Sequence, residues 1–143
     1  MATTMTGARL FGQILKSYGV SHLFFMDAVL RRALAEMEDT GIQRILGHSE
    51  KGVAYMADGY ARVSGRPGVC MAQSVGAANL ASGMQDPWLG HSPVVAISGR
   101  HVSTMQYRNA YQEVDHQPLY SAVTKLHMKI DALDRKSTRL NSS

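Results

Sequence analysis

The sequence has few of the features that mark secreted or membrane proteins. It contains a single cysteine, Cys70, so an internal disulfide is excluded and a reducing cytosol fits. No apolar run approaches the roughly 20 residues that span a bilayer, and the first ten residues lack the basic and apolar regions of a signal peptide. With 143 residues and only four prolines, the chain is predicted to be one cytoplasmic globular domain without membrane contact.

The net charge of +4 is not gathered into one surface. Residues 134–143 carry three bases against one acid, and the bases elsewhere are scattered among acids. A nucleic-acid-binding protein normally shows a clustered basic face or stripe, so no nucleic-acid partner is predicted. The six histidines lack the closely spaced pairs that are typical of metal sites, so no metal site is predicted either.

Strand-like and helix-like patterns alternate along about the first hundred residues. Four apolar runs predict strands, at 20–26, 42–46, 67–73 and 92–99, the last continuously apolar as in a buried parallel strand. Helical spacing predicts helices after Thr6 with Thr6 as N-cap, over 28–38, over 49–63 with Ser49 as N-cap, and over 77–84. The polar and aromatic segment 100–125 predicts a long loop with helical turns. This order predicts an α/β fold in three layers, a parallel sheet with helices on both faces.

One carboxylate, Glu50, follows the second predicted strand and stands on the first turn of a helix rich in Ala and Gly. Ligands of parallel α/β sheets bind at the carboxyl ends of the strands, so Glu50 is predicted to face a cleft. A structural explanation is also open, because an acid on a first turn interacts favourably with the helix dipole. The interior glycines Gly52 and Gly59 each cost about 1 kcal/mol relative to alanine, which asks for a packing or ligand reason.

Four blocks follow one another along the chain: H-S-E-K-G-V-A-Y-M-A-D-G-Y-A-R-V-S-G-R-P-G-V, Q-S-V-G-A-A-N-L-A-S-G, S-P-V-V-A-I-S-G-R and Y-Q-E-V-D-H-Q-P. In order and spacing they resemble the N-terminal, pyrimidine-binding domain of thiamine diphosphate enzymes of the acetolactate synthase and 2-oxo acid decarboxylase type. The resemblance covers most of residues 7 to 130. It implies the thiamine diphosphate-binding fold over residues 1–133, with the last strand and helix of the domain missing and one sheet edge uncovered.

The resemblance implies a role for Glu50. In the family, the matching glutamate hydrogen-bonds N1′ of the cofactor's aminopyrimidine and favours the imino tautomer, which takes the proton from thiazolium C2. A carboxylate buried beside that ring would have a raised affinity for protons. Val75, Gly76 and Asn79 stand in the block that corresponds to the family's cofactor-binding S-G-P-G-x-x-N, although Val75 and Ala77 depart from that pattern. A plain helix-terminus role for Asn79 is the alternative.

Two more segments are implied to line the site. F-F-M-D-A stands in place of the family's F-G-x-P-G turn, which puts Asp27 and Ala28 beside the cofactor in a pocket of altered shape. Gln112, in Y-Q-E-V-D, matches the family's loop on the substrate side, and a solvated loop position is the alternative.

For the full-length protein the resemblance implies an enzyme, a transferase or lyase that performs acetolactate synthase-like carboligation or decarboxylation of 2-oxo acids. It would form a homodimer or homotetramer with the active site between subunits. Mg²⁺ would be held by a separate domain through a G-D-G motif and a downstream Asn, neither of which occurs here, and FAD could bind elsewhere in the protein. The alternative is a non-catalytic Rossmann-like module that binds a nucleotide or a partner, but no G-x-G-x-x-G follows the first strand.

Residues 134–143, D-R-K-S-T-R-L-N-S-S, are polar and show no periodicity. They match the translation of a common sequencing adapter. We expect them to be an artefact and the natural protein to continue beyond Leu133, with a natural flexible tail as the alternative.

Overall fold

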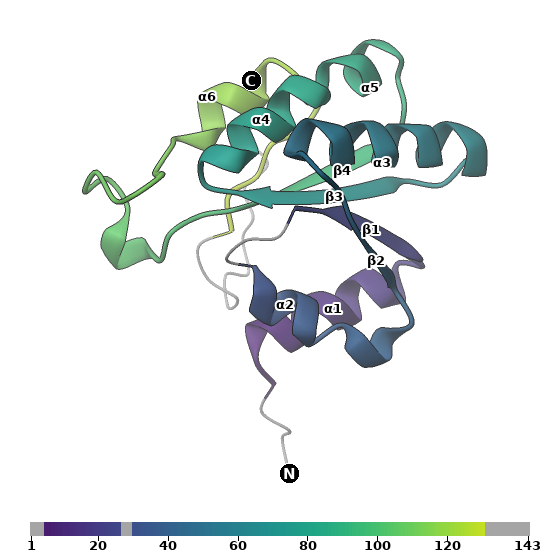
Figure 1. Ribbon diagram of the computed structural model, residues 1–143, viewed down its shortest axis with the longest axis horizontal. Helices are drawn as coiled ribbons and strands as arrows, with labels where there is room; N and C mark the ends of the chain where they lie inside the picture. The colour runs from purple at the N-terminus through teal and green to yellow at the C-terminus, as the bar shows by residue number, and fades with distance from the viewer. Residues whose placement is uncertain (1–4, 27–29, 131–143) are drawn as a thin grey trace.

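The computed structural model describes residues 5–26 and 30–130 (Figure 1). Its sheet consists of four parallel strands in the order β2-β1-β3-β4. The strands are β1 His22–Phe25, β2 Gln43–Leu46, β3 Gly68–Gln73 and β4 Val94–Gly99. Because β1 lies between β2 and β3, the chain crosses over β1 when it passes from the second strand to the third. All carboxyl ends therefore meet at one edge of the sheet.

Helices cover both faces of the sheet, which confirms the predicted three layers (Figure 1). Helices α1 and α2 pack on one face, and α3, α4, α5 and α6 lie on the other. Their bounds are α1 Gly7–Ser17, α2 Arg31–Ala35, α3 Glu50–Ser64, α4 Val75–Gly83, α5 Gln85–Leu89 and α6 His116–Ser121. Two short 3₁₀ turns, η1 Glu38–Thr40 and η2 Ser103–Met105, complete the described elements.

Local chemistry accounts for where the two long helices begin. The hydroxyl of Thr6 accepts a hydrogen bond from the Arg9 amide at 3.2 Å and caps α1. Ser49 caps α3 in the same way, with its hydroxyl accepting from the Gly52 amide at 3.0 Å. Each bond satisfies one of the amide donors that an α-helix leaves unpaired at its start. Both predicted N-caps are confirmed.

Two apolar clusters lie on opposite faces of the sheet, because successive strand side chains point in opposite directions. Leu23, Val69 and Met71 face α1 and α2. Phe24 and Cys70 face the other way, against the small residues of α3 and α4. Burial raises the pKa of the Cys70 thiol to about 12, so this cysteine is a core residue and not a nucleophile.

The structure corrects several predicted boundaries. Of the helix predicted over 28–38, residues 28 and 29 lie outside the described residues. The helix α2 runs from Arg31 to Ala35, and the chain tightens afterwards into η1. Strand β4 was predicted to be fully buried, yet Val95 is 48% exposed. Within the described residues β4 is the outer strand of the sheet, so nothing pairs with its free edge. Its continuous apolar sequence therefore gave a misleading signal of burial.

Candidate functional site

The site is built where β2 and β3 end and the helices after them begin. Glu50 is the first residue of α3, and Val75 to Asn79 form the first turn of α4. Helices α3 and α4 pack side by side on the same face of the sheet (Figure 1). The amide of Asn79 donates a hydrogen bond from Nδ2 to Oε2 of Glu50 at 3.3 Å. Two residues that are 29 positions apart in the sequence are thus brought together, as the cleft prediction requires.

Gly76 explains how α4 approaches the carboxylate so closely. A Cβ at this position would lie 2.6 Å from Oε1 of Glu50 and 3.2 Å from its Cδ. Only a residue without a side chain leaves that space open. The carboxylate therefore lies between the Gly76 backbone and the Asn79 amide, with both oxygens defined by their neighbours.

The Glu50 side chain is half-buried in the described part of the chain. The described part of the chain covers one side of it, through α4, and leaves the other side accessible. A carboxylate in this position can accept a hydrogen bond or share a proton with a group that arrives from the open side.

The residue directly before the first turn of α4 has a strained backbone conformation. Ser74 has φ 49° and ψ −132°, values close to those of the first central residue of a type II′ turn, where glycine dominates. A non-glycine residue held there costs of the order of 1–3 kcal/mol. Counted back from Asn79, Ser74 stands at the first glycine of the S-G-P-G-x-x-N pattern and Ala77 at one of its free positions. Departures from the pattern therefore include Ser74 and Val75, and the predicted departure at Ala77 was wrong; the strain at Ser74 could have been predicted from the sequence.

The Ser74 turn is held by His116, which the sequence analysis did not single out. His116 is only 2% exposed, its Nε2 lies 3.0 Å from the Ser74 carbonyl, and its Nδ1 lies 3.1 Å from the Ser98 hydroxyl. Burial lowers the pKa of His116, and the nearby positive charge of Arg100 acts in the same direction. His116 lies in the polar segment predicted as a loop, so the local sequence did not indicate that its side chain would be buried.

Gln112 lies in a loop of its own, away from Glu50. Its φ is 60°, and its side-chain amide donates to the hydroxyl of the neighbouring Tyr111 at 3.3 Å. The loop is closed by Glu113, whose carboxylate accepts hydrogen bonds from the amides of Tyr107, Arg108 and Ala110. These donors lower the pKa of the Glu113 carboxyl. The bonds found for Gln112 remain local, so the structure does not join it to the Glu50 cluster.

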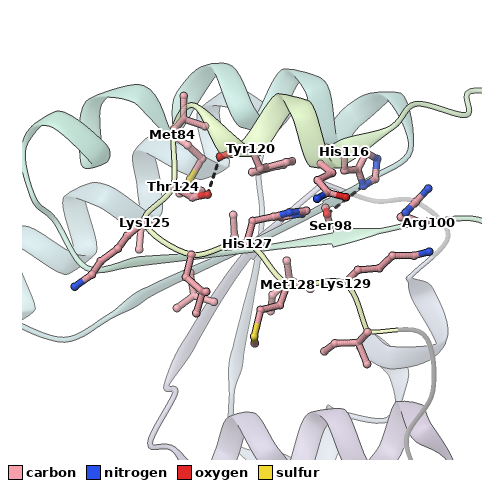
Figure 2. A pocket seen from close by; sticks show the side chains of 18 of the residues that line it. Met84, Ser98, Arg100, His116, Tyr120, Thr124, Lys125, His127, Met128 and Lys129 are labelled. Carbon is pink, nitrogen blue, oxygen red and sulfur yellow. Dashed lines mark hydrogen bonds between the residues drawn. The ribbon is translucent and has the colours of Figure 1, made fainter. Parts of the chain in front are cut away.

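A cavity of about 1100 Å³ runs along β4 (Figure 2). It is open to solvent and lined in part by β4, α6 and the segment 123–130, with Ser98, His116 and Tyr120 on its wall. Arg100, Lys125 and Lys129 give its rim a positive character. Glu50 does not line this cavity, so its volume belongs to the open edge of the sheet and not to the carboxylate cluster.

Residues 5–26 and 30–130 contain neither a cluster of metal ligands nor a helix that could span a membrane. No group of three or more His, Cys, Asp or Glu side chains in this part is arranged to hold a metal ion. Among the same residues, no helix has the length and apolar character needed to cross a membrane.

A family model described as "Thiamine pyrophosphate enzyme, N-terminal TPP binding domain" matches residues 5–119. The chain belongs to this family. The match includes the whole Glu50, Gly76 and Asn79 cluster, and the parallel α/β architecture agrees with the thiamine pyrophosphate-binding fold. The predicted family and fold class are both confirmed.

Relatives of this thiamine pyrophosphate-binding domain are longer proteins. The acetolactate synthase isozyme 2 large subunit of Escherichia coli is 36% identical over 132 residues, covering 91% of this chain and 24% of the relative. A Haemophilus influenzae protein is also 36% identical over 132 residues, covering 91% of this chain and 50% of its own length. Sulfoacetaldehyde acetyltransferase of Alcaligenes xylosoxydans is 34% identical over 123 residues, covering 85% and 20%. The chain thus spans half or less of these relatives.

Two predicted residues of the thiamine pyrophosphate-binding domain, Asp27 and Ala28, lie outside the described residues, as does the segment 134–143. Val75 is described and 41% exposed, on the first turn of α4 beside Gly76.

Proposed function

We propose that this chain is the aminopyrimidine-binding part of a thiamine diphosphate enzyme that acts on 2-oxo acids, by acetolactate synthase-like carboligation or by decarboxylation. The single observation that carries the proposal is the Glu50 carboxylate, set between Gly76 and the Asn79 amide at the carboxyl edge of the sheet. Family membership supplies the cofactor class, and the acetolactate synthase among the relatives supports the reaction class.

Each residue of the cluster has a distinct part in this proposal. Glu50 holds a proton in common with N1′ of the aminopyrimidine, on the side of the carboxylate that the chain leaves open. The Asn79 amide orients that carboxylate from the other side. Gly76 and Val75 provide the close backbone surface of the pocket. Asp27 and Ala28 are proposed as cofactor-binding residues from the sequence alone, since they lie outside the described residues. When bound, thiamine diphosphate supplies a carbon nucleophile and an electron sink for 2-oxo acid chemistry.

The residues present fit such a group. The half-buried carboxylate offers an acceptor towards solvent, and the missing side chain of Gly76 leaves that carboxylate room to lie against α4. The diphosphate and Mg²⁺ would be bound by another domain, and FAD, where used, by a third. Gln112 would contact the substrate side of the bound cofactor. Its loop would then have to face a part of the active site that the described residues do not form.

We also propose a cytoplasmic homodimer or homotetramer in which a second subunit covers Glu50. The outward face of α3 supports this assembly. Gly52, Met56, Gly59 and Val63 recur at helical spacing along it, and Val63 is 91% exposed. A Cβ at Gly59 would meet nothing within 4 Å, so the described part of the chain supplies no packing reason for this glycine. A closely packed neighbouring chain would supply one.

The decisive test is Glu50→Gln in the full-length protein. The amide keeps the size of the side chain but cannot share its proton in the same way, so pyruvate consumption should fall by about 10²–10⁴-fold. The matched control is Glu38→Gln, an exposed glutamate in η1 that should leave the rate unchanged. Full turnover by Glu50→Gln would exclude the proton-sharing role and favour a non-catalytic binding module.

A further inference from the structure

Helix α6 binds the strained turn that carries the site. His116 lies at the start of α6, and its Nε2 atom is 3.0 Å from the carbonyl oxygen of Ser74. A carbonyl oxygen can only accept, so Nε2 must carry the ring proton. Nδ1 then accepts from the Ser98 hydroxyl on β4 at 3.1 Å, a bond drawn in Figure 2. One buried ring therefore ties α6 and β4 to the turn between β3 and α4.

A second side chain of α6 reinforces this contact one helical turn later. The Tyr120 hydroxyl donates to the carbonyl oxygen of Ala77 at 2.8 Å. The Ser74 carbonyl also accepts from the Ala77 amide at 3.0 Å, so both bonds from α6 fall on the first turn of α4. This is the turn that contains Gly76, which lies against the Glu50 carboxylate.

We propose that His116 is a positioning residue: it holds Ser74 in its strained conformation and thereby keeps Gly76 and Asn79 in place against Glu50. His116 does not touch Glu50 and acts only through α4. The inference rests on the proposed function of Glu50, because placement of that carboxylate matters only if it acts on the cofactor.

The geometry argues against two simpler roles. A histidine that only fills space needs no particular hydrogen-bond partner. Here both ring nitrogens form hydrogen bonds, one to the Ser98 hydroxyl on β4 and one to the Ser74 carbonyl before α4. The ring is also not placed as a base for the Ser74 hydroxyl, since its Nε2 proton is directed at the carbonyl of that residue.

The test is a double-mutant cycle between His116→Leu and Ser74→Gly in the full-length protein. Thiamine diphosphate affinity is measured by calorimetry in the presence of Mg²⁺, and the unfolding midpoint is recorded without cofactor. With Ser74 present, His116→Leu should weaken cofactor binding at least tenfold, because the turn relaxes. In the Ser74→Gly background, His116→Leu should weaken cofactor binding less than threefold. Glycine adopts this backbone conformation without needing the His116 hydrogen bond to hold it.

Equal losses in the two backgrounds would show ordinary packing and overturn the proposal. If His116→Leu does not fold, restoration of folding by Ser74→Gly supports the proposed positioning role of His116. If the protein does not fold in either background, the proposal is contradicted. His116→Gln keeps an N–H donor at a similar reach and should retain affinity better than His116→Leu. Glu50→Gln separates the two hypotheses: if it has no effect on affinity or turnover, the proposed function itself fails, whatever His116 does.

Discussion

Gly76 is the residue at which the backbone of α4 and the Glu50 carboxylate come closest. In Gly76→Ala the new Cβ would lie 2.6 Å from Oε1, so the carboxylate must move away. The displaced atoms are the end of a flexible side chain, so the fold should tolerate the change with a loss of roughly 1 kcal/mol or less. Cofactor affinity, measured by calorimetry on the full-length protein, should fall about tenfold.

Ser82→Ala is the matched control for that substitution. Ser82 is exposed at the far end of α4, and its hydroxyl donates to the Asn79 carbonyl within the helix. Its removal should leave affinity unchanged. If Gly76→Ala binds the cofactor as tightly as this control, the close approach of α4 to Glu50 has no functional importance.

The sequence predicted the role of a single residue when its place relative to a strand or helix end could be read from the local pattern. Glu50 was identified because an acid on a first helical turn after a strand has a defined location. His116 was missed because a histidine in a polar segment looks solvated. Its burial follows from α6 packing against α4, which no local pattern encodes. The cofactor roles of Glu50 and Asn79 remain predictions, although their contact is now established.

Strand β3 and helix α3 are in contact at a position where only glycine fits. A Cβ at Gly68 would lie 2.0 Å from the Ala57 carbonyl oxygen, a backbone atom that cannot rotate away. Gly68→Ala should therefore lower the free energy of unfolding by about 3 kcal/mol or more, because the whole helix must shift. Chemical denaturation measures this directly.

Gly59→Ala gives the opposite expectation on the same helix. A Cβ there would meet nothing within 4 Å among the described residues, so in a single subunit that is not associated with a second chain the higher helix propensity of alanine should raise the free energy of unfolding by about 0.5–1 kcal/mol. Similar effects of the two substitutions would mean that the α3–β3 packing is not as described.

Element prediction succeeded where a local signal marks both ends. The caps Thr6 and Ser49 and the apolar runs of β1 and β3 were read correctly because their causes lie within a few residues. The predicted length of α2 and the predicted burial of β4 were wrong. Both depend on what neighbouring elements cover, and Val95 shows that an apolar strand can stand at a sheet edge.

Assembly of the whole molecule can be tested on the outward face of α3. Met56 is 40% exposed on the stripe proposed to meet a second subunit. Met56→Lys places a charge there that would have to be desolvated, so the full-length protein should shift towards monomer in sedimentation velocity. Ile14→Lys, on α1 across the sheet, alters a side chain of similar exposure, 43%, and should not change the sedimentation profile. Equal behaviour of the two variants would argue against α3 as the interface.

The sequence by itself determined the α/β class, the order of elements, the helix caps and the family, since each follows from short-range patterns and motif spacing. Only the tertiary structure decided that β1 lies between β2 and β3 and that α3 and α4 share one face. That arrangement brings Glu50 to Gly76 and Asn79 and sets His116 against Ser74. The physical reason is that strand order and helix packing are fixed by burial across the whole sheet, between residues that are neighbours in space and distant in the chain.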